Sequence, residues 1–162
     1  MNAHHLSLSP AATHIVLEDV ARFGAASVET GGFLLAPRGE DRISIVALAG
    51  THGIERHRRL FQISELALDR LFGYADDHDL WIPAQYHSHQ RDAFMSPTDT
   101  DHGLCVEGFV SAIVPFYASP PRDPARWGWW DYERGWRRIA PPDGSTATVA
   151  FIMFDERGAG AA

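Results

Sequence analysis

The chain contains no lysine: all 14 of its basic residues are arginine. Codon bias in a GC-rich genome accounts for this, and the abundance of alanine, arginine and glycine agrees with it. The only cysteine, Cys105, excludes an internal disulfide framework and favours a reducing cytoplasm. No run of about 18 uncharged apolar residues is present, and the first residues lack the pattern of a signal peptide. We therefore expect neither a membrane span nor a secretory leader.

Positive charge is also scarce, since the net charge is −7. A nucleic-acid partner is not expected, because binding phosphates requires clustered basic residues. We interpret the one basic run, Arg56-His57-Arg58-Arg59, as a solvated loop, with a partner contact as the alternative. The hydrophobic fraction of 45% indicates a folded protein. We expect one domain over residues 10–156, between a flexible leader (1–9) and a flexible tail (157–162).

Hydrophobic periodicity predicts a mixture of helices and strands. Val16, Val20 and Phe23 form one helical stripe, which predicts a helix from Pro10 to near Gly24. The next expected elements are a hairpin of residues 31–36 and 42–48, a loop at 50–59, a strand at 60–63 and a helix capped by Ser64. A strand at 80–89 follows, in which Pro83 requires an edge or a bulge, and then a short helix from Ser96-Pro97. The last elements are a strand at 109–117, a hairpin of 127–132 with 136–139, and a strand at 146–154, for which a helix is the alternative. This mixture indicates an α+β, three-layer α/β/α-like domain with a mixed, curved central sheet.

Two histidines on one expected strand form a candidate metal site. His87 and His89 are separated by one residue, so both side chains lie on the same strand face. Asp99, beyond a short loop, supplies a third ligand. Two histidines, a carboxylate and an open position are the ligand set of a catalytic zinc site. The alternatives are two ordinary surface imidazoles and, for Ser96-x-x-Asp99, a helix capping box, which is compatible with metal binding.

Such a site needs a proton carrier that is not itself a ligand. Glu29 is the candidate because it directly precedes the apolar strand that begins with Gly31-Gly32; the alternative is an exposed loop carboxylate. We expect Cys105 to be a buried structural residue, and less so a partner of His102 in a thiol dyad.

Three segments in combination resemble the signature of the JAMM (JAB/MPN+) metalloprotease family. That signature is a glutamate, then His-x-His, about seven residues, and Ser-x-x-Asp, a combination of high specificity. It is matched here, within residues 10–117, by Glu29-Thr30-Gly31-Gly32-Phe33-Leu34-Leu35, His87-Ser88-His89 and Ser96-x-x-Asp99. Two departures concern the loop: six residues separate His89 from Ser96, and Gln90 stands where a proline is usual.

The resemblance implies a cytidine-deaminase-like MPN domain in which His87, His89 and Asp99 hold a catalytic zinc ion. It implies that Glu29 acts as general base and then acid, and that Ser96 helps to stabilise a tetrahedral oxyanion. The implied reaction is cleavage of isopeptide or peptide bonds after the C-terminus of ubiquitin or a ubiquitin-like modifier. The implied partners are that modifier, its conjugates, and the cognate activating and conjugating enzymes.

The compact chain resembles prokaryotic members associated with ubiquitin-like conjugation systems. Beside such systems the missing lysines gain a second interpretation, since the protein would escape modification itself. We expect the modifier's tail to lie extended near Gly31 and Gly32, where a backbone can approach closely. Two other functions remain open: a non-catalytic scaffold of the same fold, and an iron enzyme with two histidines and one carboxylate. The chain has no Pro-Cys-x-x-Cys segment, which argues against a zinc deaminase.

Overall fold

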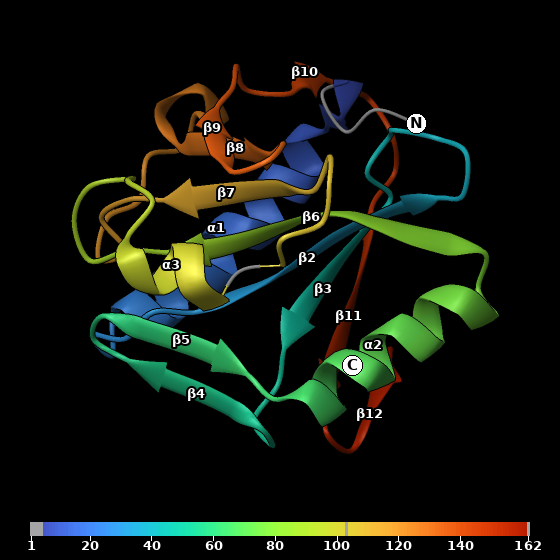
Figure 1. Ribbon diagram of the computed structural model, residues 1–162, viewed down its shortest axis with the longest axis horizontal. Coiled ribbons are helices and arrows are strands. Elements are labelled where there is room, and N and C mark those ends of the chain that lie inside the picture. The colour runs from blue at the N-terminus through green and yellow to red at the C-terminus, as the bar shows by residue number, and fades with distance from the viewer. Residues whose placement is uncertain (1–4, 103, 162) are drawn as a thin grey trace.

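A curved, mixed sheet lies between two helices in the computed structural model, which describes residues 5–102 and 104–161 (Figure 1). The elements are β1 (Ser7–Leu8), α1 (Pro10–Gly24), β2 (Gly31–Pro37), β3 (Ile45–Ala49), β4 (Ile54–His57), β5 (Leu60–Ile63), α2 (Glu65–Asp77), β6 (Leu80–Ser88), α3 (Pro97–His102), β7 (Val110–Val114), the 3-10 helix η2 (Pro124–Arg126), β8 (Gly128–Tyr132), β9 (Trp136–Arg138), β10 (Asp143–Gly144), β11 (Ala150–Asp155) and β12 (Gly158–Gly160). The α+β class and the three layers expected from the sequence are confirmed. None of the helices in the described part of the chain is long and apolar enough to span a membrane.

The main sheet has eight strands in the order β12-β11-β3-β2-β6-β7-β8-β9. Strand β6 pairs in parallel with β7, and β11 pairs in parallel with β3, whereas the other neighbours are antiparallel. The predicted hairpins β2–β3 and β8–β9 are both present. Because β6 has a neighbour on each side, the strand predicted to carry the histidines lies inside the sheet.

The two helices cover opposite faces of this sheet. Helix α1 begins where the Ser9 hydroxyl accepts a hydrogen bond from the amide of Ala12, and its buried residues include Val16 and Val20. Helix α2 begins at the predicted cap Ser64 and buries Leu71 and Ala75 in a second core cluster. Both helices are amphipathic, so each stripe of apolar residues is buried against the sheet.

Three segments depart from the sequence-based prediction. Residues 54–57, expected as loop, form β4, which pairs antiparallel with β5 in a separate hairpin. Residues 7–8 of the expected leader form β1, with Leu6 and Leu8 buried, and residues 158–160 of the expected tail form β12 against β11. Strand β1 forms by pairing with the distant strand β10, whereas β4 and β12 form hairpins with the strands next to them in the sequence, although their own composition has little strand character. Residues 1–4 and 162 of these two segments lie outside the described residues.

Candidate metal centre

The end of β6 and the residue that follows it carry the two histidines. Ala84 and Tyr86 join the core on the α1 face, so the alternating side chain of His87 points to the opposite face. His87 pairs with Gly31 of β2 and with Ile113 of β7, and the amide of His89 donates to the carbonyl of Val114. Hydrogen bonds on both sides therefore fix the backbone that carries the two imidazoles. Both histidines are buried.

Asp99 reaches the same point from the first turn of α3. The Ser96 hydroxyl accepts a hydrogen bond from the Asp99 amide at 3.1 Å, and the Ser96 amide donates to Oδ2 of Asp99 at 2.9 Å. This reciprocal pair is a capping box. The predicted capping box is therefore present, and it also orients the Asp99 carboxylate toward the histidines.

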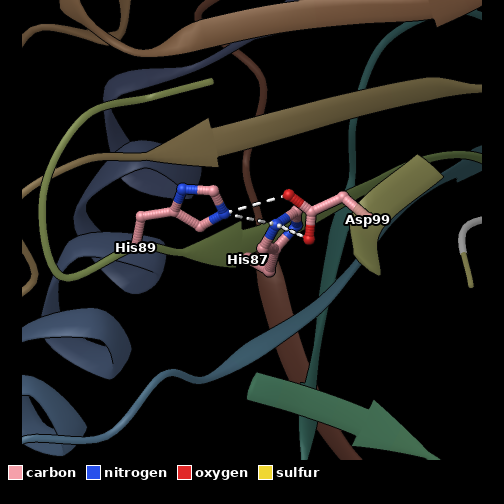
Figure 2. Close-up of side chains that lie close together, drawn as sticks. All are labelled: His87, His89 and Asp99. Carbon is pink, nitrogen blue, oxygen red and sulfur yellow. Dashed lines mark hydrogen bonds and ion pairs between the residues drawn. The ribbon is translucent and has the colours of Figure 1, made fainter. Parts of the chain in front are cut away.

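The three predicted ligands converge (Figure 2). Nε2 of His87 lies 3.2 Å from Nε2 of His89 and 3.0 Å from Oδ1 of Asp99. Nε2 of His89 lies 3.1 Å from Oδ2 of Asp99. Ligand atoms around a tetrahedral zinc ion lie roughly 3.3 to 3.5 Å from one another. The triangle formed by these atoms is thus close to the size that such an ion requires.

The chemistry of the donor set also fits a cation. Nδ1 of His89 lies 3.0 Å from the carbonyl oxygen of Asp92, which can only accept, so Nδ1 carries a proton. In the neutral ring, Nε2 then presents a lone pair toward a carboxylate oxygen. Two electron-rich atoms at this distance need a proton or a metal ion between them. The residues present therefore fit a divalent metal such as zinc.

The charges at the centre shift the pKa values of Asp99 and His89 in opposite directions. Burial favours the protonated form of Asp99, but hydrogen bonds with His87 and His89 outweigh it and hold the pKa of Asp99 well below its usual range. Burial also works to lower the pKa of His89, yet the hydrogen bond and charge of Asp99 raise that pKa overall. Asp99 is consequently anionic at neutral pH, as a metal-ligating carboxylate must be.

Glu29 lines the same groove as His87 and Asp99, and only Thr30 separates it from β2. It is buried, and burial raises the pKa of its carboxyl to about 7, with the charge of His89 opposing this shift and that of Asp99 adding to it. Glu29 is therefore not an exposed loop carboxylate. A carboxyl group with a pKa near neutral pH can both accept and return a proton.

This pKa leads to a prediction for the metal-free protein. The folded-state pKa of Glu29 is above its ordinary value of 4.5, so the folded state binds more protons than the unfolded state between pH 4.5 and about 7. The contribution of Glu29 to the free energy of unfolding therefore falls as pH rises through this window and is constant above it. The variant Glu29→Gln removes this contribution. The free energy of unfolding of the variant, minus that of the wild type, should therefore increase from pH 4.5 to 7. Urea unfolding at several pH values in a chelator measures it, and a constant difference between the two proteins would contradict it.

The groove has a volume of about 500 Å³ and runs from the candidate ligands His87 and Asp99 along β5. All four residues of β5 line it, and among the described residues β5 pairs with a strand on one edge only, namely β4. Gly31 and Gly32 do not offer the expected free edge, because β2 is paired on both sides. A Cβ on Gly31 would lie 2.6 Å from the Phe61 ring and from the Tyr86 carbonyl oxygen. The glycines thus permit close packing within the protein.

A pair of glycine substitutions tests this packing. In Gly32→Ala the new methyl would meet the carbonyl of Ala47 and the ring of Tyr86, which should destabilise the fold by about 1–3 kcal/mol. Gly73, inside α2, has open space around it, so Gly73→Ala should stabilise the fold by about 0.5–1 kcal/mol. Chemical denaturation of both variants measures these effects. Equal stability of the two variants would contradict the packing role of Gly32.

Three contributors to the site were missed by sequence reasoning: Thr30, Ser88 and Arg56. Ser88 lies between the two histidines, and its hydroxyl accepts a hydrogen bond from the Thr30 amide at 2.9 Å. Arg56, interpreted as part of a solvated loop, is half-buried and donates to the Thr30 hydroxyl at 3.0 Å. No sequence signal indicates these contacts, because their partners are 58 and 26 residues apart.

Two other expectations concern side chains near the centre. The hydroxyl of Ser96 caps α3, and its part in stabilising an oxyanion stays a prediction. Cys105 is exposed, so the expectation of a buried structural cysteine is wrong. The side chain of His102, the partner in the alternative thiol dyad, lies outside the described residues.

Comparison with solved structures identifies the fold. A crystal structure of a JAB1/MPN domain protein from Archaeoglobus fulgidus aligns with a TM-score of 0.50 at 15% identity, covering 87% of this chain and 98% of that one. The chain has an MPN-like fold. Solution structures of proteins from Desulfitobacterium hafniense and Salinibacter ruber also align. The protein from Desulfitobacterium hafniense aligns with a TM-score of 0.64 at 13% identity, covering 93% of this chain and 94% of that one. The protein from Salinibacter ruber aligns with a TM-score of 0.51 at 23% identity, covering 81% of this chain and 89% of that one. No protein-family model and no curated protein sequence matches the chain. The His-His-Asp centre thus lies within an MPN-like fold.

Proposed function

We propose that this protein is a zinc-dependent isopeptidase or peptidase that cleaves after the C-terminus of ubiquitin or a ubiquitin-like modifier. The observation that carries the proposal is the convergence of His87, His89 and Asp99, with the buried acid Glu29 in the same groove. The MPN-like fold supports it. Its partners would be the modifier, its conjugates and the cognate activating and conjugating enzymes. The low cysteine content supports placing this activity in a reducing cytoplasm.

The chain's own residues supply the proton transfers. His87, His89 and Asp99 would hold zinc, which supplies Lewis-acid chemistry by polarising a carbonyl and lowering the pKa of water. Glu29, as the carboxylate, accepts a proton from the attacking water and then delivers it to the leaving amine. Ser96 is proposed to donate a hydrogen bond to the tetrahedral oxyanion. Burial of Glu29 limits competition from bulk water for these protons.

The free edge of β5 is the best candidate for binding the modifier's tail. An extended peptide can add to an unpaired strand edge through main-chain hydrogen bonds. Apolar side chains of β5, Leu60, Phe61 and Ile63, line the groove together with Leu68 of α2. These side chains provide contacts for alternate residues of an extended tail. The groove therefore takes the place of the Gly31–Gly32 edge in the binding hypothesis.

Cleavage assays test the function directly. The purified protein is loaded with zinc and incubated with linear fusions and with lysine-linked conjugates of candidate ubiquitin-like modifiers, with and without a chelator. We expect release of a modifier with a free C-terminal carboxyl, confirmed by mass spectrometry and abolished by the chelator. Stoichiometric metal without cleavage of any conjugate would instead favour the non-catalytic scaffold. Bound iron with oxygen-dependent turnover would favour the iron enzyme.

A further inference from the structure

The backbone that carries Glu29 is held between two strands. On one side, the Thr30 amide donates to the Ser88 hydroxyl, and the Ser88 amide donates to the Thr30 carbonyl at 2.9 Å. On the other side, the Glu29 amide donates to the carbonyl of His57 in β4 at 2.8 Å. The segment therefore connects the metal-ligand strand β6 with the hairpin β4–β5 that forms one wall of the groove.

Arg56 fastens this hairpin to the rest of the domain. Its Nε donates to the Thr30 hydroxyl at 3.0 Å, and its two terminal nitrogens donate to the carbonyls of Gly50 and Ala49 at 2.6 Å each. Its guanidinium lies 3.9 Å from the ring centroid of Phe23 in α1. One side chain thus joins β4 to the start of β2, to the end of β3 and to α1.

We propose that Arg56 is a positioning residue for Glu29: through the Thr30 hydroxyl and the adjacent His57 carbonyl it sets where the proton-transferring carboxyl lies relative to the metal ligands. This inference rests on the proposed function for its catalytic consequence. Arg56 does not touch His87, His89 or Asp99 through any hydrogen bond in the described part of the chain. Its loss should therefore affect proton transfer more than metal binding.

The geometry requires arginine. A planar guanidinium donates in several fixed directions at once and stacks on an aromatic ring, whereas a lysine ammonium is a point charge on a flexible stem. Arg56→Lys retains the positive charge but cannot reach the Thr30 hydroxyl and both carbonyls together. Misplacement of a catalytic group by about 1 Å can cost about a hundredfold in rate. The positioning contact is thus expected to appear in kcat.

Thr30 offers a matched pair of variants. Thr30→Val has nearly the same shape but loses the hydroxyl that accepts from Arg56, whereas Thr30→Ser keeps it. Amide hydrogen exchange, followed by NMR without substrate, reads the position directly. In Thr30→Val and Arg56→Lys we expect the Glu29 amide to exchange about tenfold faster than in the wild type, as expected for losing one hydrogen bond. In Thr30→Ser it should exchange as in the wild type, and the amide of Phe33 should be unchanged in all variants.

Kinetics supply the second readout. Thr30→Val and Arg56→Lys should each bind one zinc ion per chain and lower kcat about tenfold or more, with KM changed less than twofold. Thr30→Ser, which keeps the hydroxyl, should have the kcat of the wild type. Unchanged Glu29 exchange in both variants would overturn the proposal, as would a normal kcat in an active enzyme. The exchange experiment needs no turnover. If no conjugate is cleaved by the wild type, the proposed function fails while the exchange result still decides the position of Glu29.

Discussion

Replacing Glu29 by glutamine is expected to abolish bond cleavage and to leave the metal content unchanged. Glutamine has nearly the same size and fills the same buried position, but it cannot accept a proton from water. Positioned general acid–base catalysis contributes about 10²–10⁴ in rate, so kcat should fall by at least about a hundredfold. Single-turnover assays and metal analysis of the same preparation measure the two quantities.

The matched control is Glu55→Gln. Glu55 lines the same groove, but it is an exposed residue of β4, so its neutralisation should leave kcat within about threefold of the wild type. A Glu29→Gln variant with normal turnover would remove Glu29 from the mechanism. Equal losses in both variants would indicate a general effect of groove charge instead of proton transfer.

Replacing Asp99 by asparagine is expected to remove metal binding while preserving α3. The asparagine side-chain oxygen can still accept the hydrogen bond from the Ser96 amide, so the cap of α3 is kept. The negative charge of the candidate ligand is lost. A metal present at about a thousand times its dissociation constant stabilises the folded state by about 4 kcal/mol. The wild type should therefore show a rise in Tm of several degrees with zinc, which a chelator reverses and which Asp99→Asn lacks.

Asp92→Asn is the control for this experiment. Asp92 contacts His89 through its backbone carbonyl, and its side chain is exposed, so the substitution should leave zinc stabilisation intact. Calorimetry and metal analysis of the three proteins give the answer. Full zinc stoichiometry and an unchanged zinc-dependent Tm in Asp99→Asn would exclude Asp99 as a ligand.

Local patterns in the sequence predicted the parts of the site that local physics determines. The alternation of a strand places His87 and His89 on one side, and the spacing of Ser96 and Asp99 produces a capping box. Pro83 was expected at an edge or a bulge. The β2–β6 register shifts between Leu34 and Ala36, which pair with Ala84 and Trp81, so Pro83 lies at an irregularity of this pairing. The pairing of β6 with β7 begins at Ala84, so Pro83 also lies before the residues that pair on the other side. An internal strand thus accommodates this proline.

Pairing and packing explain what local patterns did not predict. The segment Ile54-Glu55-Arg56-His57 has little apolar character, and it becomes a strand because the neighbouring strand β5 pairs with it in a hairpin. The sequence indicates only a charged loop residue at Arg56, because its contacts with Thr30 and Phe23 arise from the folded structure. The glycines that suggested access for a ligand are enclosed by the protein's own atoms. Each of these outcomes depends on tertiary structure that overrides local propensity.

The three candidate ligands belong to elements that differ in local stability. His87 lies in a central strand of the eight-stranded sheet and His89 directly follows that strand, whereas Asp99 depends on a helix of only six residues. So short a helix is marginal by itself and can fray without disturbing the sheet. Escape of a bound ion would then begin with detachment of the aspartate, at a rate governed by local opening of α3. Metal exchange with the surrounding pool should accordingly be much faster than global unfolding.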